Sequence, residues 1–195
     1  MRIQSIILAA GASTRMSSPK QLLPLQQSTL IRLTAEKLIP LSLLPVICIT
    51  GYLHTELQEA LEGLNIQFLR NTNHQQGMHT SIQTAIRHVQ SDIRCDAVLI
   101  SLTDQPLIPR SHYQALTTAA LTSDNQIIAT RYKQTTGVPA LFKRSLFEEL
   151  LQLQSKGGAK QLIARHHAMT EHILCEAAGL DIDTDEDYRK LLDLF

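Results

Sequence analysis

Residues 3–24 read IQSIILAAGASTRMSSPKQLLP, and this stretch holds the first of several similar transitions along the chain. An apolar run from Ile3 to Ala9 leads directly into a loop that contains small residues and two cations, Arg15 and Lys20. Short apolar and β-branched runs that end at turn residues are typical of buried strands. We therefore predict a strand over residues 3–9, followed by a loop of unusual composition.

The same alternation continues outward from this stretch. Further strand-like runs are Val46 to Thr50, Ile66 to Leu69, Ala97 to Leu102 and Ile127 to Thr130. Helical spacing lies between them: in TSIQTAIRHVQ, residues 80–90, the apolar positions fall at i, i+3, i+4 and i+7 and share one helix face. The other predicted helices cover approximately residues 28–38, 54–62, 109–121, 144–153, 157–166 and 184–193.

Strands and helices in alternation predict an α/β fold with three layers, α/β/α, around a mostly parallel, Rossmann-like sheet. The chain has 195 residues, of which 44% are hydrophobic, enough to bury one core. No linker, repeat or low-complexity segment interrupts the pattern. We therefore expect a single domain over residues 1–195.

Composition excludes several classes of function. Lys plus Arg and Asp plus Glu both number 18, so no global field attracts nucleic acid or an anionic membrane surface. Cys48, Cys95 and Cys175 are far apart beside apolar runs, which predicts reduced, buried thiols. We find neither a zinc-ligand spacing among the histidines nor an apolar stretch of about 18 residues. We expect a cytoplasmic protein with no signal peptide or membrane span.

The predicted topology indicates where a ligand would bind. Open α/β sheets bind ligands beyond the carboxyl ends of their strands. Polar stretches follow three predicted strands, AAGASTRM at 9–16, NTNHQQGMHTS at 71–81 and TDQP at 103–106, and a fourth, LDIDTDED, occupies 180–187. We expect all four to meet at one edge of the sheet.

The first of these stretches has the chemistry of a polyphosphate site. Small residues from Ala9 to Ala12 let the backbone approach a ligand, and successive N–H groups form an anion-binding concavity. Arg15 can grip phosphate oxygens with its planar fork, and Lys20 adds a mobile charge. The alternative is an ordinary turn with two solvated cations. With Gly11 as its one glycine, the loop fits neither a P-loop nor a dinucleotide-binding fingerprint.

Carboxylates in the later stretches indicate a metal. Asp104 follows a buried strand, where a carboxylate is costly unless it faces a cation, so we predict a Mg²⁺ ligand there. The alternative is that Asp104 has no metal-binding role and simply belongs to a turn, because Asp and Pro in Asp104-Gln105-Pro106 both favour turns. Asp181 and Asp183 alternate as on a short strand and project to one face, so one of them could complete the site. Thr184 and the acids after it predict a helix N-cap.

Residues 8–23, LAAGASTRMSSPKQLL, resemble the L-A-A-G-x-S-x-R-M-G-x-x-K-x-L-L motif of the MobA-like nucleotidyltransferases of molybdenum cofactor synthesis. Later blocks of that family follow in the same order: GMHTSIQTAI, LISLTDQPLIP, GVPALF, GGAKQLI and DIDTDEDY. Ser17 departs from the motif, which usually has glycine there. The stretches PKQLLPL and DQP resemble the members that transfer CMP more than those that transfer GMP.

The resemblance implies the nucleotide-diphospho-sugar transferase type of fold and a Mg²⁺-dependent reaction. CMP would pass from CTP to the terminal phosphate of the molybdopterin cofactor, and a molybdoenzyme would receive the product. Guanylyl transfer, another phosphorylated acceptor such as a sugar or alcohol phosphate, and a module that carries nucleotide or cofactor without catalysis are the alternatives. Residues 131–142 and 155–160 would shape the pterin side.

The resemblance also implies roles for individual residues. Arg15, Lys20 and Asp104 would be catalytic. Mg²⁺ would be held by Asp104 with Asp181 or Asp183, and related enzymes favour Asp181. Gly77 and Ser81, which open the helix that carries Ile82 to Val89, would lie against the base, although helix capping explains them equally well. The nucleotide-binding set would be Leu8, Ala9, Ala10, Gly11, Ser13, Arg15, Lys20, Gly77 and Ser81.

Overall fold

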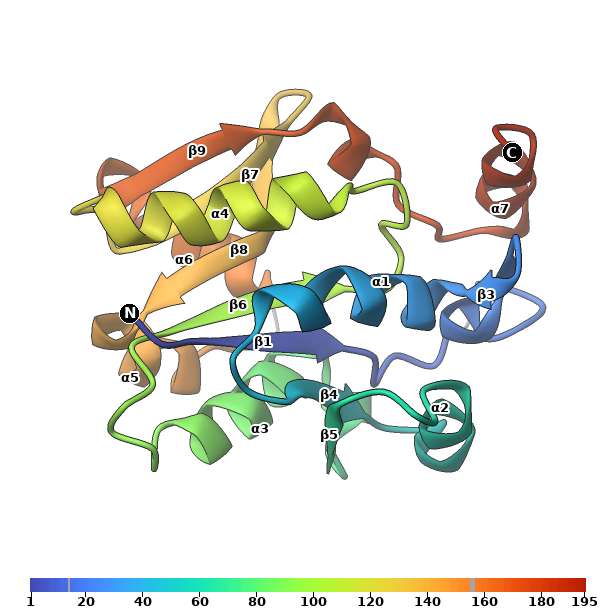
Figure 1. Ribbon diagram of the computed structural model, residues 1–195, viewed down its shortest axis with the longest axis horizontal. Helices are drawn as coiled ribbons and strands as arrows, with labels where there is room; N and C mark the ends of the chain where they lie inside the picture. The colour runs from blue at the N-terminus through green and yellow to red at the C-terminus, as the bar shows by residue number, and fades with distance from the viewer. Residues whose placement is uncertain (14, 155–156) are drawn as a thin grey trace.

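A computed structural model describes residues 1–13, 15–154 and 157–195. A seven-stranded sheet in the order β5-β4-β1-β6-β8-β7-β9 forms its centre (Figure 1). The strands are β1 (Ile3–Leu8), β4 (Val46–Thr50), β5 (Ile66–Arg70), β6 (Ala97–Leu102), β7 (Ile127–Tyr132), β8 (Thr135–Lys143) and β9 (Thr170–Leu174). β8 runs antiparallel to β6 and β7, whereas the other neighbouring pairs are parallel. The prediction of a mostly parallel sheet is confirmed.

The central strand β1 explains why the sheet is covered on both faces. Ile6 pairs with Ile47 of β4 on one side and with Ile100 of β6 on the other. Side chains alternate between faces along a strand, so Ile6 packs into one core and Ile7 into the other. All three isoleucines of the central pairing are essentially inaccessible to solvent.

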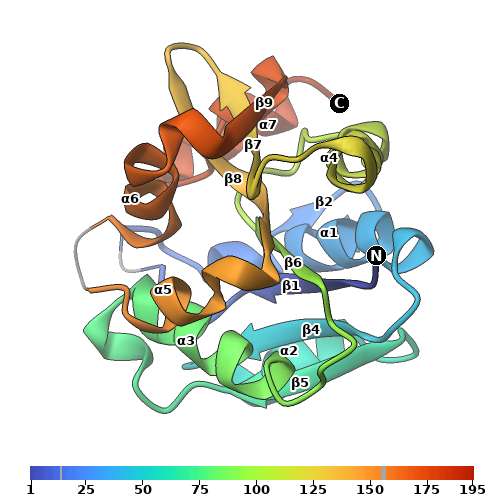
Figure 2. The same cartoon turned by 90° about the vertical axis from the view of Figure 1, so that its left-hand side faces the viewer.

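Helices form the two outer layers. α1 (Leu30–Leu38), α2 (His54–Ala60) and α4 (Arg110–Thr122) pack their apolar residues into the same core as Ile7. α3 (Met78–Val89), α5 (Phe147–Leu151) and α6 (Gly158–Arg165) pack into the core that contains Ile6. Figure 2 shows α1 and α4 on one side of the sheet and α3, α5 and α6 on the other. The predicted three-layer α/β/α architecture is confirmed.

A smaller cluster joins the N-terminal and C-terminal parts of the chain. Leu25 of the hairpin β2 (Pro24–Leu25) and β3 (Ser28–Thr29) packs with Ile182 and with Leu191 of α7 (Asp185–Leu192). The Tyr188 hydroxyl donates a hydrogen bond to the Pro24 carbonyl. These contacts place residues 181–187 beside the loop that follows β1. The remaining short elements are 3₁₀ turns: Lys20–Leu22, Ile39–Leu41, His74–Gln76, Arg144–Leu146, His167–Met169 and Glu176–Gly179.

Three expectations about the elements need correction. The strands β8 and β9 were not predicted, and residues 181–183, expected as a short strand that carries Asp181 and Asp183, belong to no strand. Ile182 N–H donates to the Asp104 carbonyl at 2.9 Å, and the tertiary packing of Ile182 keeps this segment extended. The helix expected over 144–153 is a 3₁₀ turn followed by the short α5.

Two other expectations concern the cysteines and the membrane. Cys48 and Cys95 are buried free thiols, as expected, whereas Cys175 is only half-buried.

In the part of the chain that the structure describes, we find no helix with the length and apolar character needed to cross a membrane.

Candidate active site

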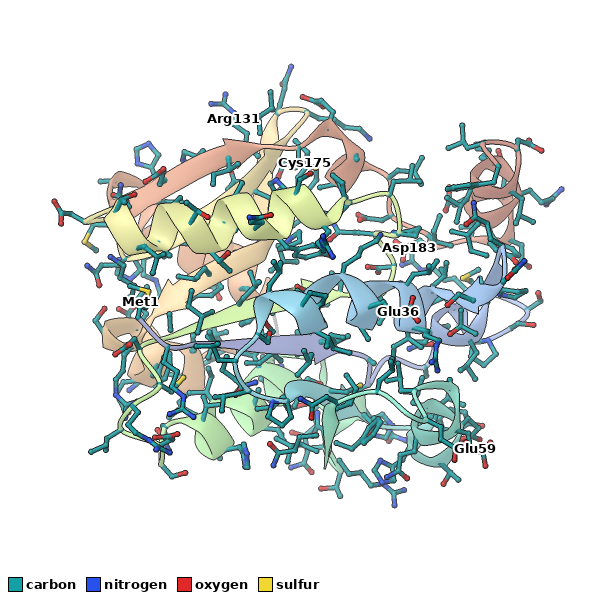
Figure 3. All side chains as sticks on the ribbon, viewed as in Figure 1. Met1, Glu36, Glu59, Arg131, Cys175 and Asp183 are labelled. Atoms are coloured by element: carbon teal, nitrogen blue, oxygen red, sulfur yellow. The ribbon has the colours of Figure 1, made fainter. Side chains whose placement is uncertain are left out.

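The four predicted stretches meet at one edge of the sheet. They line two adjoining cavities of about 280 Å³ and about 440 Å³. The residues common to both cavities are Leu8, Lys20, Met78, Leu102 and Asp104. Figure 3 labels Asp183 in the segment between β9 and α7, toward the side of the molecule to which the arrowheads of β1 and β9 point in Figure 1. The topology therefore brings these distant stretches to one cleft.

A cluster of two cations and two carboxylates lies at the centre of this cleft. Lys20 Nζ lies 2.6 Å from Asp104 Oδ2 and 3.0 Å from Asp183 Oδ1. Arg15 Nη2 lies 2.9 Å from Asp183 Oδ2. The Lys20 and Asp104 side chains are 18% and 14% exposed, whereas Arg15 is 69% exposed. The ammonium thus bridges two carboxylates in a largely shielded place, and the guanidinium closes the cluster toward solvent.

The electrostatics of the cluster favour the charged forms. Burial alone would lower the pKa of Lys20, but the negative charges and hydrogen bonds of Asp104 and Asp183 outweigh it and raise that pKa above its ordinary value. Burial also opposes ionisation of Asp183, yet the hydrogen bond and charge of Lys20, with the charge of Arg15, hold its pKa below the usual range. Lys20 and Asp183 are therefore both ionised near neutral pH.

Asp181 lies at the edge of the cluster. It lines the larger cavity, but no ion pair within 4.0 Å joins it to a described cation. Desolvation, followed by the negative charge of Asp104, raises the pKa of Asp181. Asp181 and Asp183 thus differ in environment although they are two residues apart.

The carboxylates provide suitable oxygen ligands for a hard divalent cation. Asp104 Oδ1 is buried and, among the described residues, has no hydrogen-bond partner, while its other oxygen is held by Lys20. Across the described ranges, no three His, Cys, Asp or Glu side chains gather into a metal-binding group. Such a site would therefore need oxygens from a ligand, which is how Mg²⁺ is commonly bound: by one or two carboxylates together with phosphates and water.

The loop after β1 is held in shape by a residue that sequence reasoning missed. Gln21 is 1% exposed, and its amide donates to the Gly11 carbonyl at 2.7 Å. Ser13 adopts a positive φ of 50°; its hydroxyl donates to Gln21 Oε1 and accepts from Lys20 N–H. The buried glutamine thus holds the backbone that precedes Arg15. A glutamine directly before the apolar run Leu22 to Leu25 was the one signal in the sequence.

Gly51, also missed, allows three loops to approach one another. A Cβ at this position would lie 2.6 Å from the Ala10 carbonyl oxygen and 2.8 Å from His74 Cγ. Gly51 directly follows β4, so this crowding occurs at the carboxyl edge of the sheet. Only a residue without a side chain fits there unless its neighbours move.

Gly77 and Ser81 lie in the wall of the smaller cavity. Gly77 is the N-cap of α3 and has a φ of 119°, which favours glycine, so the helix begins earlier than the sequence suggested. Ser81 is buried inside the first turns of α3, and its hydroxyl accepts a hydrogen bond from the Asn71 amide at 3.0 Å. Ser81 is therefore not the helix cap.

Ser17, which departs from the family motif, makes a contact of its own. Its hydroxyl donates to Asp185 Oδ1 at 3.1 Å, which ties the first loop to the start of α7. The described non-glycine residues with positive φ are Ser13, Gln26 and Lys133, so the backbone at residue 17 does not require glycine. Of the second-substrate segments expected from sequence, Ser155 and Lys156 lie outside the described residues, as does Thr14 of the first loop.

The fold and this cleft define a class: an α/β protein whose ligand site lies at the carboxyl edge of a mostly parallel sheet, with cations facing carboxylates. Comparison with known proteins identifies the family within this class. The family model of the MobA-like NTP transferase domain matches residues 5–170, and the chain belongs to this family of nucleotidyltransferases.

Individual relatives agree with this family. The chain is 26% identical over 187 residues to the molybdenum cofactor cytidylyltransferase of Escherichia coli K12, covering 95% of this chain and 93% of that one. The crystal structure of Rv0371c from Mycobacterium tuberculosis H37Rv superposes with a TM-score of 0.82 at 26% identity, covering 98% and 97% of the two chains. A manganese complex of Rv0371c gives a TM-score of 0.79 at 26% identity with full coverage of both chains.

Proposed function

We propose that this protein transfers CMP from CTP to the terminal phosphate of the molybdopterin cofactor, with Mg²⁺, and releases pyrophosphate. The observation that carries the proposal is the meeting of Arg15 and Lys20 with Asp104 and Asp183 through contacts of 2.6–3.0 Å. The similarity to a cytidylyltransferase over nearly the whole chain supports the choice of substrates.

The two cations have complementary roles in this proposal. Arg15 is exposed at the mouth of the cleft, where its planar fork suits the oxygens of the β and γ phosphates. Lys20 is more deeply placed and has a point charge that can follow negative charge as it develops near the α phosphate. The loop fixed by Gln21 adds backbone N–H groups, and Gly77 and Ser81 in the smaller cavity would contact the nucleotide.

The carboxylates would hold the metal. Asp104 has a buried oxygen without a hydrogen-bond partner among the described residues, and Asp183 shares the Lys20 ammonium with it, so this pair marks a point where a cation is stabilised. Asp181 is the neighbouring third carboxylate of the same cavity. When bound, Mg²⁺ would neutralise charge on the triphosphate and the departing pyrophosphate. The manganese complex of Rv0371c is consistent with a divalent cation in this fold.

The reaction requires positioning more than proton transfer. An oxygen of the acceptor phosphate attacks the α-phosphorus of CTP, a new P–O bond forms, the bond to the β-phosphate oxygen breaks, and pyrophosphate leaves with that electron pair. A phosphate monoester has its second pKa at about 6, so the attacking oxygen is already ionised near neutrality. The protein therefore needs no general base, and Arg15, Lys20 and the loop align the reacting groups.

The test is incubation with molybdopterin cofactor and each labelled nucleoside triphosphate, scored by pyrophosphate release and by the nucleotide attached. We expect CMP transfer that requires Mg²⁺ and falls by at least about a hundredfold in Asp104→Ala, the usual scale for a lost electrostatic group. Transfer of GMP, or turnover only with a sugar or alcohol phosphate, would change the substrate assignment.

A thermal-shift measurement separates catalysis from binding alone. A ligand present at 100 times its Kd adds about 2.7 kcal/mol to the free energy of unfolding, so binding of CTP is easily detected. Stabilisation by nucleotide without pyrophosphate release for any triphosphate and acceptor would show a carrier module and contradict the proposal.

A further inference from the structure

A third cation lines the larger cavity, in the stretch 155–160 that the family resemblance assigns to the pterin side. Lys160 lies in the first turn of α6 and lines this cavity together with Arg15, Lys20 and Asp104. Its aliphatic stem passes over Gly137 of β8, where a Cβ would come within 3.0 Å of Lys160 Cε. Its ammonium lies 5.9 Å from the centre of the Tyr132 ring. This exposed side chain thus lies with its aliphatic stem against β7 and β8.

Lys160 differs from the other two cations in its partners. Lys20 and Arg15 are each neutralised by carboxylates within 3.0 Å. Within residues 1–13, 15–154 and 157–195, Lys160 has neither a carboxylate within 4.0 Å nor a hydrogen-bond acceptor. Its positive charge acts on Asp181 of the same cavity without forming an ion pair, whereas Arg15 and Lys20 are directly paired with carboxylates.

Lys160 also connects this cavity to a second hollow. Of the residues that the structure describes, it alone lines both the larger cavity of the cleft and an open hollow of about 770 Å³ between β7, β8, α6 and β9. The described lining of this hollow includes Arg131, His167 and His172 and contains no Asp or Glu. Figure 3 labels Arg131 near the top of the molecule, well away from Asp183. A path with excess positive charge thus leads from the carboxylate cluster to a separate basic surface.

The proposed reaction requires a cation in this place. Two anions, the triphosphate and the acceptor phosphate, must come within bonding distance, and their repulsion rises as water is excluded. If Lys20 and Arg15 serve the triphosphate, a different cation must compensate the acceptor. Lys160 lines the same cavity, rests its stem against Gly137 and Tyr132, and among the described residues has no ion pair to break before it binds an anion.

We propose that Lys160 binds the phosphate of the acceptor substrate, and that the hollow lined by Arg131 and His172 holds the remainder of an acceptor that carries further negative or hydrogen-bond-accepting groups. This inference rests on the proposed nucleotidyl transfer and adds the acceptor subsite to it. Lys160 is then a substrate-binding residue on the wall opposite the nucleotide.

Steady-state kinetics test this inference through a split between the two substrates. In Lys160→Met the acceptor KM rises by about ten- to a hundredfold, the effect of losing a charge-assisted hydrogen bond, while the KM for CTP stays the same. Lys160→Arg recovers most of the loss. Lys190→Met, which removes an exposed lysine on α7, is the matched control and leaves both KM values unchanged. An unchanged acceptor KM in Lys160→Met, or equal rises in both KM values, overturns the inference.

A binding experiment separates this inference from the choice of acceptor. With Mg²⁺ and a non-hydrolysable CTP analogue at saturation, titration calorimetry measures the binding of phenyl phosphate, a simple phosphate monoester. We expect binding by wild type and by Arg131→Ala, and none by Lys160→Met. Loss in Lys160→Met together with no transfer to molybdopterin would refute the named acceptor but support the subsite. Equal binding by Lys160→Met and wild type, or no binding by wild type, refutes the subsite.

Discussion

At the scale of single residues, Lys20 has two competing sets of partners. Its ammonium bridges Asp104 and Asp183, the same carboxylates that we propose for the metal. A lysine in that position competes with a divalent cation for the same oxygens. When nucleotide and metal bind together, the triphosphate gives the ammonium new anionic partners, so the two ligands should assist each other.

This competition predicts that Lys20→Met binds divalent metal more tightly than wild type when nucleotide is absent. Removal of the ammonium leaves Asp104 without a cation and Asp183 with Arg15 alone, and Mn²⁺ would compensate the added negative charge. Manganese titration followed by electron paramagnetic resonance measures the effect, and we expect about a tenfold lower Kd. In the same variant CTP turnover falls. Metal affinity equal to that of Lys190→Met and wild type would show that Lys20 does not occupy the metal position.

Gln21 gives a second prediction at this scale. In Gln21→Glu a carboxylate replaces the amide that donates to the Gly11 carbonyl, so two acceptors face each other in a buried place. We expect a loss of about 1–3 kcal/mol in the free energy of unfolding, measured by urea denaturation, and a higher KM for CTP. Gln27→Glu makes the same chemical change at an exposed position and should alter neither. Equal stability of the two variants would contradict the role given to Gln21.

The sequence predicts those site residues whose role depends on their position after a strand. Arg15, Lys20 and Asp104 could be proposed because each follows a recognisable apolar run and bears a charge. Gln21 and Gly51 could not, because their roles depend on neighbours from other parts of the chain: the Gly11 carbonyl for the first, and Ala10 with His74 for the second.

At the scale of elements, the start of α7 holds the Asp183 backbone. Thr184 and Asp187 form a capping box, and Asp187 Oδ2 accepts from the N–H groups of Thr184 at 2.9 Å and Asp183 at 3.3 Å. Thr184 had been expected as an N-cap, and this is confirmed. The cap thus connects the stability of a surface helix with the position of a carboxylate in the cleft.

Asp187→Ala should therefore affect both stability and activity. Loss of the cap costs about 1 kcal/mol of unfolding free energy, and the less constrained Asp183 lowers turnover. Glu186→Ala, which removes an exposed acid from the same helical turn but leaves the capping box, is the control. Chemical denaturation and pyrophosphate release measure the two effects. A variant that loses stability but keeps full turnover would separate the cap from the site.

The packing of α4 against the sheet predicts a pH dependence of stability. His112 is buried, its Nε2 lies 2.8 Å from Thr130 Oγ1, and burial lowers its pKa below the ordinary 6.5. Below pH 6.5 the unfolded chain binds a proton at this imidazole more readily than the folded chain does. Stability is thus fully present above that pH and is lost as the pH falls toward the lower folded value.

His112→Gln should reduce this dependence. Urea denaturation between about pH 7.5 and about pH 5.5 spans the ordinary histidine value, and we expect a shallower decline for the variant than for wild type. His88→Gln changes an exposed histidine on α3 and should retain the wild-type slope. Identical slopes for His112→Gln and wild type would exclude His112 as the cause.

Elements with mixed patterns were the ones that sequence reasoning missed. β8 contains Pro139, which weakens a strand prediction, and its register with β7 shifts between Ala129 and Thr130. β9 lies at the edge of the sheet and alternates half-buried with exposed residues. The segment around Asp181 and Asp183 shows strand-like alternation because Ile182 packs against α7, without a partner strand.

At the scale of the whole molecule, the balanced net charge means that function depends on local fields. The cleft has paired cations and carboxylates, while the hollow beyond Lys160 has excess positive charge. The parallel arrangement of β1, β4, β5 and β6 determines the first feature, because it brings their carboxyl ends together. This arrangement could be predicted from the alternation of strands and helices. The hollow beyond Lys160 depends on β8 and β9, which the sequence did not predict, so the hollow could not be predicted either.

The most direct test of the account is a crystal structure with Mg²⁺ and a non-hydrolysable CTP analogue. We predict that the triphosphate contacts Arg15 and Lys20, that Lys20 has left Asp104, and that the metal joins Asp104 to phosphate oxygens. A triphosphate bound elsewhere, with the Lys20–Asp104 pair still intact, would contradict the account.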